Sequence, residues 1–264
     1  MSSVELDDIT VNYSLHGSGP PVVLLHGLAE DHRSWDGVAD RLRGFTVYAL
    51  DLRGHGQTTA GEGTGTLTQL SGDLDAFLRS VTGPAAVVGY SLGGTIGLRA
   101  ATEPDTLISH LIAIATSSVV GSAAAEFFAG RIAQLEAGDT SGFAAGLRDD
   151  TAAQIVTPSD VDAVTARRLD AIGDGSGYIN AARAMIGIRS EPLNPLLEHV
   201  GIPVDIIGAS DDVFCPRRAS DIIVEGVTGS RYHEIAGAGH LISVDQPDAY
   251  GTLIARLLGE RQSA

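Results

Sequence analysis

The distribution of apolar and polar residues divides the chain into short apolar runs and longer segments with helical spacing. The short runs predict strands and lie at residues 4–6, 10–15, 22–25, 45–50, 85–88, 107–115, 204–207 and 232–235. The run at 22–25 is continuously apolar, as expected for a strand buried on both faces. Between them, apolar residues at helical spacing predict helices, most clearly at 34–42, 67–81 and 247–258. Strands that alternate with helices predict an α/β protein with a mostly parallel sheet and helices on both of its faces.

Residues 117–195 follow a different pattern. This segment is rich in alanine, glycine and acidic residues, and it shows helical spacing without strand-like runs. We interpret it as a small helical cap inserted into a core formed by residues 1–116 and 196–264. The alternative is that it continues the layers of the main sheet. A cap would cover the carboxyl ends of the parallel strands, where the binding crevice of such sheets lies.

Length and charge narrow the class of protein. The 264 residues fit one domain with an insertion, and the net charge of −16 argues against a nucleic-acid partner. No apolar stretch reaches the ~18 residues of a membrane helix, and the start of the chain lacks the basic and apolar blocks of a signal peptide. The single cysteine, Cys215, excludes an internal disulfide. We therefore predict a soluble, cytoplasmic protein with a small-molecule substrate and without a membrane partner; its oligomeric state stays open.

The absence of lysine excludes several chemistries. All 17 basic residues are arginines, so the chain can form no Schiff base with a carbonyl, no pyridoxal phosphate linkage and no P-loop. Its histidines and its cysteine do not show metal-ligand spacing, and no dinucleotide fingerprint follows a strand. We expect an activity that needs neither a cofactor nor a metal.

One short motif indicates nucleophilic catalysis. Gly89, Ser91 and Gly93 form a G-x-S-x-G pattern between the apolar run 85–88 and a helix-like run at 95–101. A serine at such a strand-to-helix corner sits on a tight turn that exposes its hydroxyl above the sheet. The glycines leave room where a Cβ atom would meet the neighbouring strand or helix. Ser91 is therefore the candidate nucleophile.

A serine hydroxyl needs a base and an acid that orients the base. His240 follows the strand at 232–235 in a loop of small residues, and it is the candidate base. The acid is expected after the strand at 204–207, where Asp211 and Asp212 are adjacent. Only one of the two can face His240, and spacing alone leaves both open.

Attack on a carbonyl also needs backbone N–H groups that bind the oxyanion. The first is expected from Leu92, directly after the nucleophile. The second is expected from Leu28, in the loop that follows the strand at 22–25. His26 precedes it in a His-Gly turn, and we interpret His26 as a structural part of this loop.

These motifs, in this order, resemble those of the α/β-hydrolase superfamily along nearly the whole chain. The similar segments are the oxyanion loop at 26–27, the loop at 51–56, the nucleophile elbow at 89–93, the acid loop at 208–211 and the histidine loop at 239–240. In that superfamily the acid commonly stands three residues after a glycine. The resemblance therefore favours Asp211 over Asp212 as the triad acid.

The resemblance also implies an activity. Epoxide hydrolases and haloalkane dehalogenases of this fold use an aspartate nucleophile, whereas position 91 is serine. The segment 177–203 is similar to the branch of enol-lactonases and small-ester hydrolases. The resemblance thus implies hydrolysis of a small carboxylic ester, lactone or thioester through an acyl-enzyme. The same triad could serve C–C bond hydrolysis, acyl transfer, perhydrolysis or a lyase step, and a non-enzymatic ligand receptor is the alternative from another class.

Overall fold

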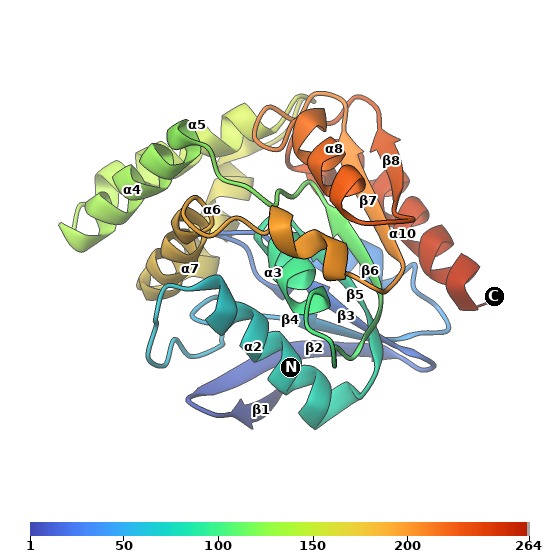
Figure 1. Cartoon of the computed structure of the whole chain (residues 1–264). Helices are drawn as coiled ribbons and strands as arrows, with labels where there is room; N and C mark the ends of the chain where they lie inside the picture. Colours follow the sequence, from blue (N-terminus) through green and yellow to red (C-terminus); the bar gives the residue numbers. More distant parts are fainter. Residues whose placement is uncertain (263–264) are drawn as a thin grey trace.

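Eight strands form one sheet at the centre of the computed structural model, which describes residues 1–262 (Figure 1). Across the sheet they follow the order β1-β2-β4-β3-β5-β6-β7-β8. The pairs β1–β2 and β2–β4 are antiparallel, and the remaining pairs of the sheet are parallel. The strands are β1 (Ser2–Leu6), β2 (Ile9–Gly17), β3 (Pro21–Leu25), β4 (Thr46–Leu50), β5 (Ala85–Tyr90), β6 (Ile108–Ile114), β7 (Val204–Ala209) and β8 (Arg231–Ile235). The predicted mostly parallel α/β sheet is confirmed.

Helices cover both faces of the sheet because successive strand residues point to opposite sides. In β3, Val23 and Leu25 join the apolar cluster on one face, whereas Val22 and Leu24 join the cluster on the other. All four are completely buried, and each such side chain contributes about 1.5–3 kcal/mol of transfer free energy. The first face is covered by α2 (Leu67–Phe77), α3 (Leu92–Ala101) and α8 (Arg217–Gly226), and the second by α1 (Asp36–Ala39) and α10 (Pro247–Gln262).

Two predicted helices differ in detail. The helix predicted at 34–42 is a 3-10 turn, η1 (His32–Trp35), that continues into the single turn of α1. At the start of α2 the Thr66 hydroxyl accepts the N–H of Gln69, as an N-cap should. The Gln69 side chain does not accept the N–H of Thr66 in return, because its Oε1 accepts the N–H of Thr64 at 3.0 Å instead. α2 then continues into a π-helical turn, η2 (Leu78–Thr82).

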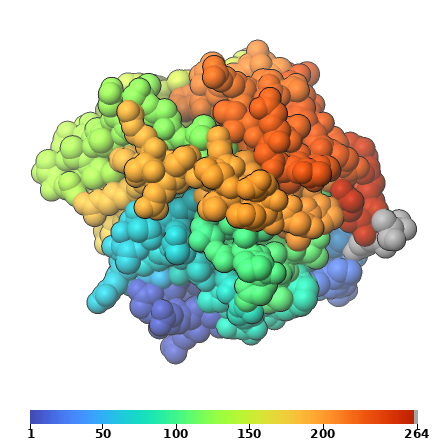
Figure 2. Space-filling view, viewed as in Figure 1, coloured from blue at the N-terminus to red at the C-terminus, as the bar shows by residue number. Residues whose placement is uncertain are grey.

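The chain between β6 and β7 forms helices beyond the carboxyl ends of the strands (Figure 1). They are α4 (Ser122–Glu136), α5 (Thr140–Gln154), α6 (Val161–Ile172), α7 (Ser176–Gly187) and the short η3 (Asn194–His199). Phe143 and Tyr178 meet edge to face at 5.1 Å inside a separate apolar cluster. In Figure 2 the green atoms of α4 and α5 project at the upper left, beside the orange atoms of the α8 region. We propose to treat residues 117–195 as a cap because its helices share this core of their own.

Candidate active site

Ser91 sits on a sharp turn between a central strand and a buried helix. β5 ends at Tyr90 and α3 begins at Leu92, so Ser91 alone makes the corner. Its φ of 50° lies in the region that side chains other than glycine rarely adopt. The turn is held by Ser91 N–H on the carbonyl of Ile114 at 2.8 Å and by the Thr116 hydroxyl on the carbonyl of Ser91 at 2.7 Å. Such strain costs about 1–3 kcal/mol, and it leaves the Ser91 hydroxyl at the carboxyl end of the sheet.

The flanking glycines are required by close backbone contacts. A Cβ atom on Gly89 would lie 2.3 Å from the carbonyl oxygen of Gly93. A Cβ atom on Gly93 would lie 2.3 Å from the carbonyl oxygen of Leu25 in β3. Both contacts are with backbone, which cannot move aside without disturbing the sheet. The pattern that singles out Ser91 in the sequence therefore has a steric cause.

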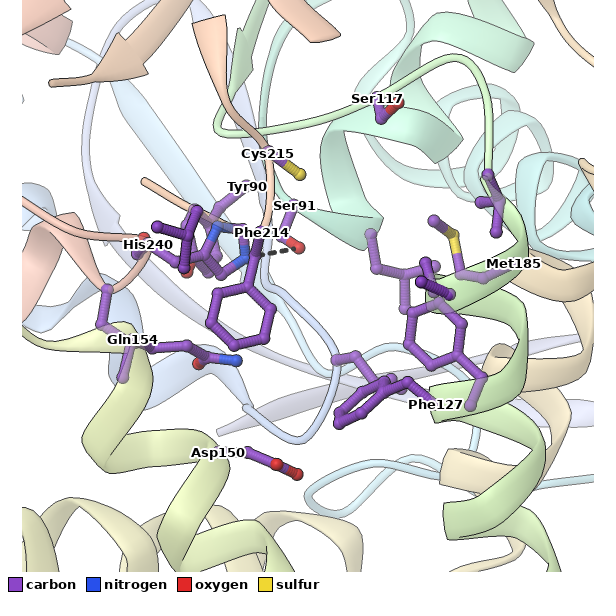
Figure 3. A pocket seen from close by; sticks show the side chains of 18 of the residues that line it. Tyr90, Ser91, Ser117, Phe127, Asp150, Gln154, Met185, Phe214, Cys215 and His240 are labelled. Carbon is purple, nitrogen blue, oxygen red and sulfur yellow. Dashed lines mark hydrogen bonds between the residues drawn. The ribbon is translucent and has the colours of Figure 1, made fainter. Parts of the chain in front are cut away.

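The imidazole of His240 connects Ser91 to a buried carboxylate. His240 Nε2 lies 3.1 Å from Ser91 Oγ (Figure 3). On the other side of the ring, His240 Nδ1 lies 2.8 Å from Asp212 Oδ2. Both distances are within hydrogen-bond reach. Ser91 and His240 are thus brought together as the sequence indicates, although 149 positions separate them.

The carboxylate that meets His240 belongs to Asp212, and the preference for Asp211 is corrected on this point. Asp211 is exposed, and its Oδ2 accepts the hydroxyl of the adjacent Ser210 at 2.7 Å. Its N–H donates to the carbonyl of Ala238. β7 continues to Ala209, two residues beyond the predicted strand end, so the loop that carries both aspartates begins later than expected. Adjacent loop residues point in different directions, and a count from Gly208 does not capture this.

Asp212 is held ionised and oriented by its surroundings. Its second oxygen, Oδ1, accepts the N–H groups of Phe214 at 2.8 Å and Cys215 at 2.9 Å. Burial by itself raises the pKa of this carboxyl, but the charge and hydrogen bond of His240 and these two N–H groups outweigh burial and lower it. A side chain that accepts N–H groups two and three residues ahead makes an Asx-type turn. That turn orients Asp212, but it is visible only in the structure and leaves no signal in the sequence that separates Asp212 from Asp211.

Two residues that sequence reasoning missed fix the histidine loop. The Tyr90 hydroxyl donates to the carbonyl of His240 at 2.8 Å. Asp245, in α9 (Ile242–Asp245), accepts the N–H of Gly239 at 2.8 Å and that of Thr157, which follows α5, at 2.8 Å. The loop that carries the base is thereby tied to both the sheet and the cap, which limits how far the imidazole can drift from Ser91.

The predicted oxyanion donors, Leu28 and Leu92, both line the cavity that contains Ser91. Among residues 1–262, neither backbone N–H is taken up by a protein acceptor. His26 shapes the loop before Leu28, since its Nε2 accepts the N–H of Leu52 at 2.9 Å and its Nδ1 therefore donates to the carbonyl of Gly27. Its nitrogens are committed to the backbone, in keeping with a structural role.

The cavity above Ser91 has a volume of about 550 Å³, within the range typical of small-molecule sites. Figure 3 shows Ser91 and His240 on one side of it and Phe127 and Met185 on the other. Its walls combine loops of the sheet with side chains of the cap and are mostly apolar, including Val119, Val120, Phe127, Phe128, Leu147, Met185, Val213 and Phe214. Apolar walls around a buried nucleophile favour an uncharged reacting group.

Two clusters bring together residue types that can ligate metals. In the first, Cys215 joins Asp212 and His240; in the second, His32 joins Asp31 and Asp51. Burial raises the pKa of the Cys215 thiol, which disfavours the thiolate that a metal would need. His32 and Asp51 already share a hydrogen bond of 2.7 Å, and Asp31 pairs with Arg33. The expectation of chemistry without metal or cofactor stays a prediction.

Comparison with known proteins agrees with this architecture. The family model described as alpha/beta hydrolase fold matches residues 20–247. The chain belongs to this family. This confirms the family expected from the motifs and, with it, the broad class of enzyme, a hydrolase. Within the part of the chain that the structure describes, the helices are too short or too polar to cross a membrane.

Solved structures of other hydrolases resemble this α/β-hydrolase closely in fold. The enol-lactonase from Burkholderia xenovorans LB400 is 22% identical with a TM-score of 0.86, and the match covers 98% of this chain and 100% of that one. An esterase from Exiguobacterium antarcticum is 20% identical with a TM-score of 0.86, over 98% and 99% of the two chains. Among curated proteins, the pimeloyl-[acyl-carrier protein] methyl ester esterase of Neisseria meningitidis is 24% identical, over 88% of this chain and 91% of its own.

Proposed function

We propose that this α/β-hydrolase is a cofactor-independent serine hydrolase that cleaves a small carboxylic ester, lactone or thioester through an acyl-enzyme. The observation that carries the proposal is the continuous line from Ser91 Oγ through the imidazole of His240 to Asp212, with gaps of 3.1 and 2.8 Å. The line ends at a cavity of about 550 Å³. The similarity in fold to an enol-lactonase and to an esterase supports the same class of substrate.

In the first half-reaction Ser91 Oγ attacks the carbonyl carbon of the substrate. His240 Nε2 accepts the hydroxyl proton as the new C–O bond forms, and the electron pair of the C=O bond moves to the oxygen. Asp212 accepts the hydrogen bond of Nδ1–H and stabilises the imidazolium. The N–H groups of Leu28 and Leu92 are assigned to the oxyanion, which would give them the acceptor that the protein itself does not supply.

In the second half of the cycle the tetrahedral intermediate collapses. His240 donates its proton to the leaving alcohol or thiol, and the acyl group stays on Ser91. Water then attacks the acyl-enzyme with His240 as the base, and a second collapse releases the carboxylic acid and returns the proton to Ser91. For a lactone, the leaving alcohol stays covalently attached to the acyl group throughout, and deacylation releases a single hydroxy acid.

The test combines covalent labelling with turnover. We expect a fluorophosphonate to add to wild-type protein once and to Ser91→Ala not at all, with intact mass as the measurement. Ser117→Ala is the matched control because Ser117 also lines the cavity but its hydroxyl bonds the carbonyl of Val119 instead of an imidazole. Labelling of this variant should persist. Turnover of a p-nitrophenyl ester should fall by at least ~10³-fold in Ser91→Ala.

A folded Ser91→Ala protein that keeps most of its turnover would refute the assigned nucleophile. Circular dichroism of both variants confirms that the comparison is made on folded protein. Labelling that is lost in Ser117→Ala and kept in Ser91→Ala would contradict the mechanism at its first step.

A further inference from the structure

Arg53 and Arg168 are both buried, with 4% and 8% of their surface exposed. Arg53 is neutralised by two carboxylates, since its guanidinium lies 2.7 Å from both Asp8 and Asp73. Arg168 differs. Among residues 1–262, no carboxylate oxygen lies within 4.0 Å of its guanidinium. A buried cation without an ionic partner is costly, so the position of Arg168 needs an explanation.

The hydrogen bonds of Arg168 are incomplete as well. Nη1 donates to the Thr151 hydroxyl at 2.9 Å and to Gln154 Oε1 at 3.0 Å. Nη2 makes one long contact, 3.4 Å, with the carbonyl of Leu28. Nε is buried and has no partner among the described residues. Because a guanidinium carries five N–H donors, one on Nε and one on Nη2 remain without a protein acceptor.

The unsatisfied guanidinium belongs to the catalytic cavity. Arg168 extends from α6 of the cap and lines the same cavity as Ser91 and His240. Its Nη2 contacts the carbonyl of Leu28, whose own N–H is assigned to the oxyanion. Arg168 therefore contacts the same residue of the oxyanion loop whose N–H is assigned to the oxyanion.

The other charges of the cavity do not replace an ionic partner. Asp150 lines the cavity, but it is engaged by Arg131 through contacts of 2.8 and 2.9 Å. Glu30 also lines it; its Oε2 accepts the N–H of Gly27 at 3.1 Å, and it lies beyond ion-pair distance of Arg168. An anionic ligand would supply the ionic partner for Arg168 that these two carboxylates do not provide.

We propose that Arg168 is a specificity-determining residue that binds a carboxylate on the substrate. A carboxylate offers two oxygens that match the adjacent N–H groups of Nε and Nη2 in a bidentate pair. The substrate class that this assigns is a short half-ester of a dicarboxylic acid, or a lactone that carries a carboxylate. The inference rests on the proposed function for its catalytic meaning, but its binding step can be measured without turnover.

Binding is measured by calorimetry in the Ser91→Ala background, so that no ligand is consumed. Monomethyl glutarate is compared with dimethyl glutarate, which has the same chain without the free charge. We expect the half-ester to bind at least ~10-fold tighter, as a charge-assisted pair would give. With Arg168→Met added, the preference should disappear. With Arg168→Lys, which keeps the charge but loses the planar fork, part of it should remain.

Arg148→Met is the control for the loss of a cationic side chain from the cap. Arg148 lies on α5, is half exposed, and pairs with Asp162 outside the cavity. This variant should keep the full preference for the half-ester. The readout is a ratio of two affinities in one protein, so a general loosening of the cap by Arg168→Met would weaken both ligands and leave the ratio unchanged.

Equal binding of the two glutarate esters by the Ser91→Ala protein would overturn the proposal. An affinity ratio of monomethyl to dimethyl glutarate that stays unchanged in both Arg168→Met and Arg168→Lys would overturn it as well. Turnover by wild-type protein separates this inference from the proposed function. Preferential binding of the half-ester without hydrolysis of any ester would refute the hydrolase chemistry and leave the anion site standing. Hydrolysis of esters without preferential binding of the half-ester would refute the anion site and leave the hydrolase chemistry standing.

Discussion

Two buried aspartates lie at opposite ends of strand β7, and each is hydrogen-bonded to at least one histidine. Asp212 follows the carboxyl end of the strand and meets His240 at 2.8 Å. Asp205 lies near the amino end and accepts His110 from β6 and His233 from β8, both at 2.8 Å. Both carboxylates are completely buried at the level of the side chain. By composition alone, either pair could be taken for the acid and base of a hydrolase.

The difference lies in what surrounds each pair. At Asp205 both oxygens are occupied by histidines and by Arg231, whose Nε and Nη2 donate at 2.7 and 2.9 Å. Among the described residues, no serine or threonine hydroxyl bonds His110 or His233. At Asp212 the remaining acceptors take backbone N–H groups, and the second nitrogen of His240 is left for Ser91 and the cavity. A buried Asp–His contact therefore indicates catalysis only where the histidine also faces a nucleophile and open space.

The variant Asp212→Asn should give the largest effect, a loss of ester hydrolysis at the Asp212–His240 pair. The amide cannot hold the Nδ1–H tautomer or stabilise the imidazolium, so kcat for ester hydrolysis should fall roughly 10³–10⁴-fold. Asp211→Asn is the matched control on the neighbouring, exposed position, and its kcat should stay within about 3-fold of wild type. The reverse order of these two rates would restore Asp211 as the acid.

Asp205→Asn tests the cluster of Asp205 with His110 and His233 near the amino end of β7. Removal of one charge from a buried ionic cluster leaves Arg231 and two histidines without their anion, and we expect a loss of about 3 kcal/mol in the free energy of unfolding. Urea denaturation measures it. The kcat of the folded variant should remain within about 3-fold of wild type, since the cluster lies at the far end of β7 from Ser91. A large fall in kcat with unchanged stability would show that the two ends are coupled.

The smallest expected effect concerns pH. Burial raises the pKa of Asp205, but hydrogen bonds from His110, Arg231 and His233 outweigh burial and hold it well below the usual range. A carboxyl whose pKa is lowered by folding adds stability that is complete above the pKa of the unfolded chain. That stability is lost as the pH falls from about 4 through the folded pKa. The stability gap between wild type and Asp205→Asn should therefore shrink as the pH falls below about 4.

Urea denaturation curves of both proteins at successive pH values provide the measurement. Asp8 titrates separately: its hydrogen bond to Arg53 lowers its pKa to about 2, and it is present in both proteins, so its contribution cancels in the difference. A gap that widens on acidification would show that Asp205 is not ionised in the folded protein.

Much of the fold and part of the site could be predicted because they depend on local patterns. A continuous apolar run must be buried on both faces, and this places the central strands. The steric need for glycine on either side of Ser91 is visible as the motif itself. Helix ends were less predictable: η1 and α1 replace one predicted helix because packing of Trp35 against Tyr250, with ring centres 5.9 Å apart, competes with helical propensity.

The choice between Asp211 and Asp212 could not be made from the sequence. Both have the same chemistry and differ by one position, and the outcome depends on where β7 ends and on hydrogen bonds to Ala238, Phe214 and Cys215. Arg168 was missed for a similar reason. Nothing in the sequence distinguishes it from Arg167 beside it, and only the packing of α6 over the sheet buries one of them without an anion.

The sequence by itself determined the sheet and the family and indicated Ser91 and His240 as a pair, because each of these follows from patterns within a few neighbouring residues. Only the tertiary structure decided which carboxylate faces the imidazole and which arginine enters the cavity. The physical reason is that burial, charge pairing and hydrogen-bond reach are properties of distance in space. Residues 28, 168 and 240 become neighbours only after the sheet and the helices above it have packed together.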